Sequence, residues 1–223
     1  DAIATYGEYS KIPESEKNRL LSHYRHKDIQ DALFASSHHK CAFCECIPGE
    51  SSHIEVEHFE PKSLYPDLAF EWDNLLPSCR RCNEEKSDAD TRSNPIINPA
   101  IEDPEQLLTY SFLRIKPLAG SGQEHKAQQT IDVCNLNCER LYKARSELMK
   151  SITEYIDELK DKINWISEAD TDQKRKIRIT KLKNSIAVIE SLTTAESAYS
   201  GYSKWFIQQC PEYQEAKRIV ASR

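Results

Sequence analysis

Glycine and long apolar stretches are scarce in this sequence of 223 residues. It contains only 5 Gly and 1 Met, and no apolar run approaches the ~18 residues that a membrane-spanning helix needs. Residues 1–28 also lack a basic segment followed by an apolar one, the pattern of a secretory signal peptide. We therefore expect a cytoplasmic protein without a membrane segment. The length fits one or two domains with a core of their own.

An excess of positive charge is also absent. The chain holds 30 Lys and Arg against 36 Asp and Glu, a net charge of −6, whereas a domain that binds nucleic acid unaided is usually basic. Residues 1–139 carry 14 basic and 24 acidic residues (net −10), and residues 140–223 carry 16 and 12 (net +4). Attraction to a polyanion would therefore have to come from bound metal or from a partner.

The N-terminal part shows helical periodicity and then loses it. One helix is expected over residues 13–36, with Ser15 as a candidate cap. Its rough apolar stripe comprises Leu20, Leu21, Tyr24, Ile29, Leu33 and Phe34. Residues 41–98 are irregular and contain a short β-like run at 53–59. A connector rich in Pro and Gly follows, assigned to residues 96–136.

The C-terminal part, from about residue 137, is strongly helical. Leu and Ile recur at steps of mostly three and four along a first helix, at Leu141, Leu148, Ile152, Ile156, Leu159, Ile163 and Ile166. A turn at 168–172 leads to a second helix, with apolar positions at Ile177, Ile179, Leu182, Ile186, Ile189 and Leu192. This pattern predicts the core of an αα-hairpin. A shorter helical pair is expected at 202–209 and 212–221, separated by Pro211.

Four of the eight cysteines form two C-x-x-C pairs, Cys41/Cys44 and Cys79/Cys82. Two such pairs can complete a tetrahedral structural zinc site. Disulfides are disfavoured because no secretion signal is seen, and a redox motif needs one pair rather than two. The other cysteines fit less well. Cys46 breaks the paired spacing, and Cys134, Cys138 and Cys210 are expected to be small buried hydrophobes.

The 34 residues between the pairs (45–78) exceed the roughly 15–20 of a compact zinc ribbon, so a segment is inserted there. It contains Glu57-His58 and, further on, Asn74, while Asn83 directly follows the last cysteine. This order resembles the zinc-knuckle variety of HNH nucleases, which have the ββα-metal (His-Me finger) fold. The matching stretch covers roughly residues 41–90, about a quarter of the chain.

The HNH resemblance implies a role for each motif residue. His58 would be the general base, since a neutral imidazole near pH 7 can take a proton from water. Glu57 and Asn83 would supply oxygen ligands to a catalytic Mg²⁺ or Mn²⁺. Asn74 would hydrogen-bond the backbone near the His-bearing strand and orient the imidazole. Many relatives have Asp where this chain has Glu57. His53 is open between a ligand, a substrate contact and a solvated loop residue.

Positive side chains near the motif and in the helical part each have two readings. Those near the motif are Lys62, Arg80, Arg81 and Lys86. They could contact backbone phosphates or be solvated surface charges. In the basic stretch at 174–183, Lys174, Arg178 and Lys181 share one helical face. That face could follow a phosphate backbone, contact an acidic partner or be solvated.

A finer resemblance joins the motifs. The segments 56–62 (V-E-H-F-E-P-K) and 72–86, between an N-terminal helix and a helical tail, are similar to the PtuB-type nucleases. These are encoded with an ABC/SMC-like ATPase (PtuA) in bacterial anti-phage modules called Septu, and in some retron systems. The resemblance implies a nuclease effector held in a complex with that ATPase, or in a retron module with its reverse transcriptase and msDNA.

The predicted fold is α+β and mostly α, with a small zinc-stapled HNH core. Its regions are an N-terminal helical region (1–40), the nuclease core (41–95), the connector (96–136) and a C-terminal helical region (137–223). The function expected first is an endonuclease, with DNA favoured over RNA such as tRNA. A non-catalytic zinc-stapled interaction module explains the cysteines but not Glu57, His58 or Asn83. A transcription-factor zinc domain is disfavoured by the acidic surroundings.

Overall fold

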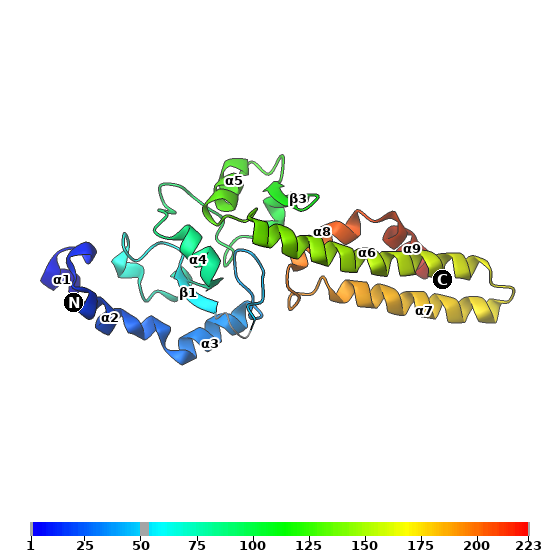
Figure 1. Cartoon of the computed structure of the whole chain (residues 1–223), viewed down its shortest axis with the longest axis horizontal. Coiled ribbons are helices and arrows are strands. Elements are labelled where there is room, and N and C mark those ends of the chain that lie inside the picture. The colour runs from blue at the N-terminus through cyan, green and yellow to red at the C-terminus, as the bar shows by residue number, and fades with distance from the viewer. Residues whose placement is uncertain (1, 50–53, 223) are drawn as a thin grey trace. The chain divides into compact units, whose positions relative to one another are not determined.

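A computed structural model describes residues 2–49 and 54–222 and divides the chain into two compact units, residues 1–138 and 139–223 (Figure 1). The chain is α+β and mostly helical, with two small antiparallel sheets among the described residues, as the sequence predicts. Within the described ranges, no helix is long and apolar enough to cross a membrane.

The N-terminal helix expected over residues 13–36 is broken. The elements are α1 (Ala2–Tyr6), η1 (Tyr9–Lys11), α2 (Glu14–Leu21), η2 (Ser22–Arg25) and α3 (Lys27–Ser36). The break lies at His26, whose backbone is extended (φ −58°, ψ 141°) and whose Nδ1 accepts a hydrogen bond from the Asp28 amide at 3.3 Å. His26 thus caps a new helix, where the sequence pattern predicts continuation. The side chains of Leu20 and Leu21 lie outside the description.

The centre of unit 1 is an antiparallel hairpin followed by a helix. Strand β1 (Ile54–His58) pairs with β2 (Leu75–Cys79), and α4 (Arg80–Lys86) begins at the next residue. The connection between the strands contains η3 (Pro66–Leu68) and η4 (Trp72–Asn74). Side chains alternate along β1: Val56 joins a buried cluster with Tyr24 and Leu33, whereas Glu55 and Glu57 bond to residues of α4.

Residues 96–136, expected to be a connector, form structure of their own. They contain η5 (Pro104–Gln106), the hairpin of β3 (Leu108–Ser111) and β4 (Arg114–Pro117), and α5 (Glu124–Val133). Ile97, Leu107 and Ala127 form a small buried cluster within this segment. The description as a connector was therefore wrong, because the Pro and Gly residues mark turns between short elements.

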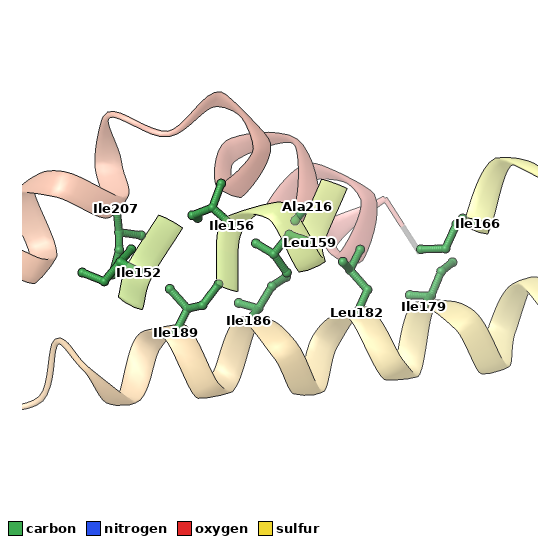
Figure 2. Close-up of a cluster of buried hydrophobic side chains, with 10 residues drawn as sticks. All are labelled: Ile152, Ile156, Leu159, Ile166, Ile179, Leu182, Ile186, Ile189, Ile207 and Ala216. Carbon is green, nitrogen blue, oxygen red and sulfur yellow. The ribbon is translucent and has the colours of Figure 1, made fainter. Parts of the chain in front are cut away.

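Unit 2 is a helical bundle, as the periodicity predicts. Its helices are α6 (Glu139–Ser167), α7 (Asp172–Ser191), α8 (Ser200–Gln208) and α9 (Pro211–Ala221). Figure 2 shows apolar side chains of α6 and α7 meeting along the hairpin. The buried cluster comprises Ile152, Ile156, Leu159, Ile166, Ile179, Leu182, Ile186, Ile189, Ile207 and Ala216. Ile177 is an exception to the predicted stripe, since it is 51% exposed.

The basic face of α7 has partners within the hairpin. The Arg178 guanidinium lies 4.4 Å from the ring centroid of Trp165, and Lys181 Nζ lies 5.0 Å from it. Lys174 Nζ forms an ion pair with Asp170 at 2.8 Å. These contacts support the α6–α7 hairpin.

Candidate nuclease site

Four cysteine sulfur atoms converge in unit 1. The Sγ atoms of Cys41, Cys44, Cys79 and Cys82 all lie within 4.8 Å of one another, and all four residues are buried. The Cys44 and Cys79 sulfur atoms are 3.8 Å apart, close to the ~3.8 Å between ligands of a tetrahedral zinc with Zn–S bonds of about 2.3 Å. The donor set and its spacing therefore fit zinc. Cys46 is buried nearby but outside this set.

The four-sulfur cluster ties together the segments that bear the predicted catalytic residues. Cys79 ends β2, which pairs with β1, and Cys82 immediately precedes Asn83 in α4. The first C-x-x-C pair, Cys41/Cys44, is also held to β2, because the Ala42 amide donates to the Pro77 carbonyl at 2.8 Å. A metal here would fix the position of α4 relative to β1.

Glu57 forms a buried ion pair with Lys86. The distance from Lys86 Nζ to Glu57 Oε1 is 2.6 Å, and the two side chains are 0% and 7% exposed. Burial raises the pKa of Glu57, and the adjacent ammonium of Lys86 counteracts that shift. Both sequence-based readings of Lys86, a phosphate contact or a solvated charge, were wrong. The lysine at the end of α4 reaches back to β1 instead.

Glu55 was not singled out from the sequence, yet it contacts a predicted ligand. Asn83 Nδ2 donates to Glu55 Oε2 at 2.6 Å. Glu55, Glu57 and Asn83 line one open pocket of about 1100 Å³. Carboxylate and amide oxygens are the donors that Mg²⁺ and Mn²⁺ prefer, and Mg²⁺ usually takes only one or two carboxylates and keeps several waters. The pocket residues fit such an ion in their chemistry.

His58 lies on the other side of β1 from the two glutamates. Its imidazole is buried, its Nε2 lies 2.9 Å from the Ala69 carbonyl oxygen, and its ring meets Tyr24 edge-on at 4.7 Å between centroids. A carbonyl oxygen only accepts, so Nε2 carries the proton in neutral His58 and Nδ1 keeps the lone pair. Burial lowers the pKa of His58 to about 4. His58 does not line the pocket of Glu57 and Asn83.

Asn74 is buried, and both its side-chain oxygen and its side-chain nitrogen form hydrogen bonds with the backbone. Its Oδ1 accepts from the Glu60 amide at 2.7 Å, and its Nδ2 donates to the carbonyls of Glu60 at 3.0 Å and Leu68 at 3.2 Å. Leu68 precedes Ala69, whose carbonyl holds His58. Asn74 thus bonds to the chain after β1 and to Leu68, the residue before the one whose carbonyl contacts the imidazole.

Among the other positive side chains near the motif, Lys62 lines the pocket, as does Arg25 of η2, which sequence reasoning missed. Arg80 and Arg81 form surface ion pairs with Glu84, at 2.7 and 3.9 Å. No local pattern pointed to Arg25, because it lies outside the motif and reaches the pocket only through the folding of η2. His53 lies outside the described residues.

Residues 41–89 match the family model described as HNH endonuclease. This segment is therefore similar to the HNH endonuclease domain. It comprises both knuckles, β1, β2 and α4, so the match coincides with the ββα arrangement and its four-cysteine cluster.

The HNH domain is set in a chain that is homologous to Septu protein PtuB. It is 43% identical over 110 residues to Septu protein PtuB of Bacillus thuringiensis, covering 49% of this chain and 41% of that protein. It is 26% identical over 159 residues to Septu protein PtuB of Bacillus mycoides (strain KBAB4), covering 58% and 53%. Protein ea31 of Escherichia phage lambda is 43% identical over 53 residues, 24% of this chain and 17% of that protein. The chain thus spans about half the length of the two PtuB relatives.

Proposed function

We propose that this chain is a metal-dependent endonuclease that hydrolyses phosphodiester bonds of nucleic acid, with DNA as the favoured substrate. The observation that carries the proposal is that Glu55, Glu57 and Asn83, all within the segment that matches the HNH family, line one pocket with carboxylate and amide groups. Glu55 and Glu57 lie on the strand that also bears His58. A purely structural zinc module has no need for carboxylates and an amide grouped in one pocket.

The proposed mechanism assigns the proton to His58. Its pKa of about 4 keeps the imidazole neutral near pH 7, and Nδ1 is the nitrogen with a free lone pair. Nδ1 takes the proton of the attacking water, while Asn74 and the Ala69 carbonyl hold the ring in orientation. Glu57 and Asn83 would hold Mg²⁺ or Mn²⁺, which when bound acts as a Lewis acid toward the phosphate.

The biological setting is proposed from the homology to Septu protein PtuB. We place the chain as the nuclease effector of an anti-phage complex with an ABC/SMC-like ATPase of the PtuA type. A net charge of −10 over residues 1–139 supports this, because such a chain attracts a polyanion poorly by itself and a partner could deliver the substrate. Cleavage of tRNA in a retron-type module is the alternative substrate assignment.

The test is a cleavage assay with the full chain, alone and with the ATPase, on plasmid DNA and on total tRNA, in Mg²⁺ or Mn²⁺. His58→Ala is expected to abolish cleavage without changing the zinc content. His125→Ala, at an exposed histidine of α5, is the matched control and should cleave like the unmodified chain. Cleavage of tRNA but not of plasmid DNA would assign the RNA alternative. No cleavage of either substrate under any condition would overturn the nuclease proposal.

A further inference from the structure

Two positive side chains converge on the ring of Tyr24. The Arg25 guanidinium lies 5.3 Å from the ring centroid, and Lys62 Nζ lies 5.7 Å from it. Arg25 Nε also donates to the Tyr24 hydroxyl at 3.1 Å. The two cations come from distant parts of the chain, η2 and the loop after β1. A buried tyrosine thus holds both at one place.

These cations are unusual in an acidic unit because they lack carboxylate partners. At least ten of the 14 Lys and Arg in residues 1–139 form ion pairs with Asp or Glu. Across residues 2–49 and 54–222, neither Arg25 nor Lys62 forms one. Glu55 and Glu57 line the same pocket, but they bond to Asn83 and Lys86. The charges of Arg25 and Lys62 are therefore available to an anion from outside.

We propose that Arg25 and Lys62 form a phosphate seat, which binds the phosphodiester backbone of the nucleic acid at the pocket of Glu57 and Asn83. This inference rests on the proposed nuclease function and names two substrate-binding residues for it. A guanidinium suits the paired oxygens of a phosphate, and a lysine ammonium adds a point charge. Because Tyr24 also meets the His58 ring edge-on, the seat lies next to the proposed base.

The phosphate seat extends the site beyond the HNH domain. Arg25 precedes residue 41, so the matched segment 41–89 supplies only Lys62 of the pair. Tyr24 positions the two cations through ring contacts and does not itself offer charge. An acidic nuclease unit would thus attract phosphate at one local point, where its own carboxylates are already bonded to other groups.

The experiment measures binding, with His58→Ala as the background so that bound strands stay intact. Fluorescence anisotropy gives Kd for labelled duplex DNA, single-stranded DNA and single-stranded RNA over a range of salt concentrations. We expect Arg25→Ala and Lys62→Ala each to raise Kd about tenfold, the loss of one charge-assisted contact. Each should lower the slope of log K against log salt by about 0.9 on duplex DNA and about 0.7 on single strands.

Matched variants separate a phosphate contact from a structural effect. Arg114→Ala removes an exposed arginine of β4 in the same unit and should leave Kd and salt slope unchanged. Arg25→Lys keeps the charge and should restore the slope while Kd stays weaker. Zinc content is measured for every variant, so a change in fold is seen directly.

The outcomes distinguish the phosphate seat from the nuclease proposal. If Arg25→Ala and Lys62→Ala bind with the Kd and slope of Arg114→Ala, or if no oligonucleotide binds the parent chain, the phosphate seat is wrong. If their slopes fall but the chain with intact His58 cleaves nothing, the seat stands and the nuclease proposal fails. Equal slope changes on single-stranded DNA and single-stranded RNA are expected, since both present a phosphodiester backbone.

Discussion

Lys86 Nζ lies 2.6 Å from Glu57 Oε1 and donates to the His58 carbonyl at 2.9 Å, with its side chain 0% exposed. One lysine at the end of α4 therefore holds two successive residues of β1. A buried charge is costly unless it is paired, so the carboxylate of Glu57 depends on this ammonium. In this ion pair, the ammonium of Lys86 contacts the Oε1 atom of Glu57.

We expect Lys86→Met to destabilise unit 1 by about 3–5 kcal/mol, because it leaves Glu57 buried without its counter-ion. Native-state hydrogen exchange of the β1 and β2 amides measures this in the full chain, separately from unit 2. Lys126→Met is the control: its ion pair with Glu102 is partly exposed, and its loss should cost about 1 kcal/mol or less. Equal losses in the two variants would contradict the special role of the buried pair.

Asn74→Asp should disturb the backbone segments around His58 at a smaller cost in stability than Lys86→Met. The new carboxylate keeps an acceptor for the Glu60 amide but faces the carbonyls of Glu60 and Leu68, which only accept. We expect a loss of about 1–3 kcal/mol for the unmade hydrogen bonds and a lower kcat, with oligonucleotide Kd unchanged. Single-turnover cleavage and anisotropy separate these effects. A changed Kd with normal kcat would show that Asn74 does not act through His58.

Zinc removal should unfold unit 1 and spare unit 2. Cys79→Ser loses one ligand of the four-sulfur cluster, and we expect zinc content to fall from one per chain together with protection of β1 and β2. Cys46→Ser is the matched control, because Cys46 is buried beside the cluster but outside it, and its zinc content should stay at one. Metal analysis and hydrogen exchange of the same samples give both readings. Zinc loss in Cys46→Ser as well would require a different ligand set.

Local signals could be read from the sequence, and long-range pairings could not. The cluster of four cysteine sulfur atoms was predictable because each C-x-x-C is a local chemical signature. The motif order proposes Glu57, His58, Asn74 and Asn83 as the catalytic residues. The partner of Lys86 is 29 residues away and is decided by how α4 crosses β1.

Helix ends within an apolar stripe could not be predicted from the sequence either. The apolar stripe over residues 13–36 suggests one helix, but His26 offers a side-chain cap that ends one turn and begins the next. Arg25 was missed for a related reason. It reaches the pocket only because η2 places it beside Tyr24 and Lys62. Apolar periodicity indicates which face of a helix or strand is buried. The contacts of His26 and Arg25 depend instead on where the elements end and how they pack together.

The two isoleucines Ile177 and Ile179 test this distinction on α7. Both belong to the predicted stripe, yet Ile179 is 6% exposed within the α6–α7 core and Ile177 is 51% exposed (Figure 2 shows Ile179). Ile179→Ala should destabilise unit 2 by about 2–5 kcal/mol through lost burial and a cavity. Ile177→Ala should change its stability by less than about 0.5 kcal/mol. Hydrogen exchange of the α6 and α7 amides measures both, and equal effects would contradict the packing of this hairpin.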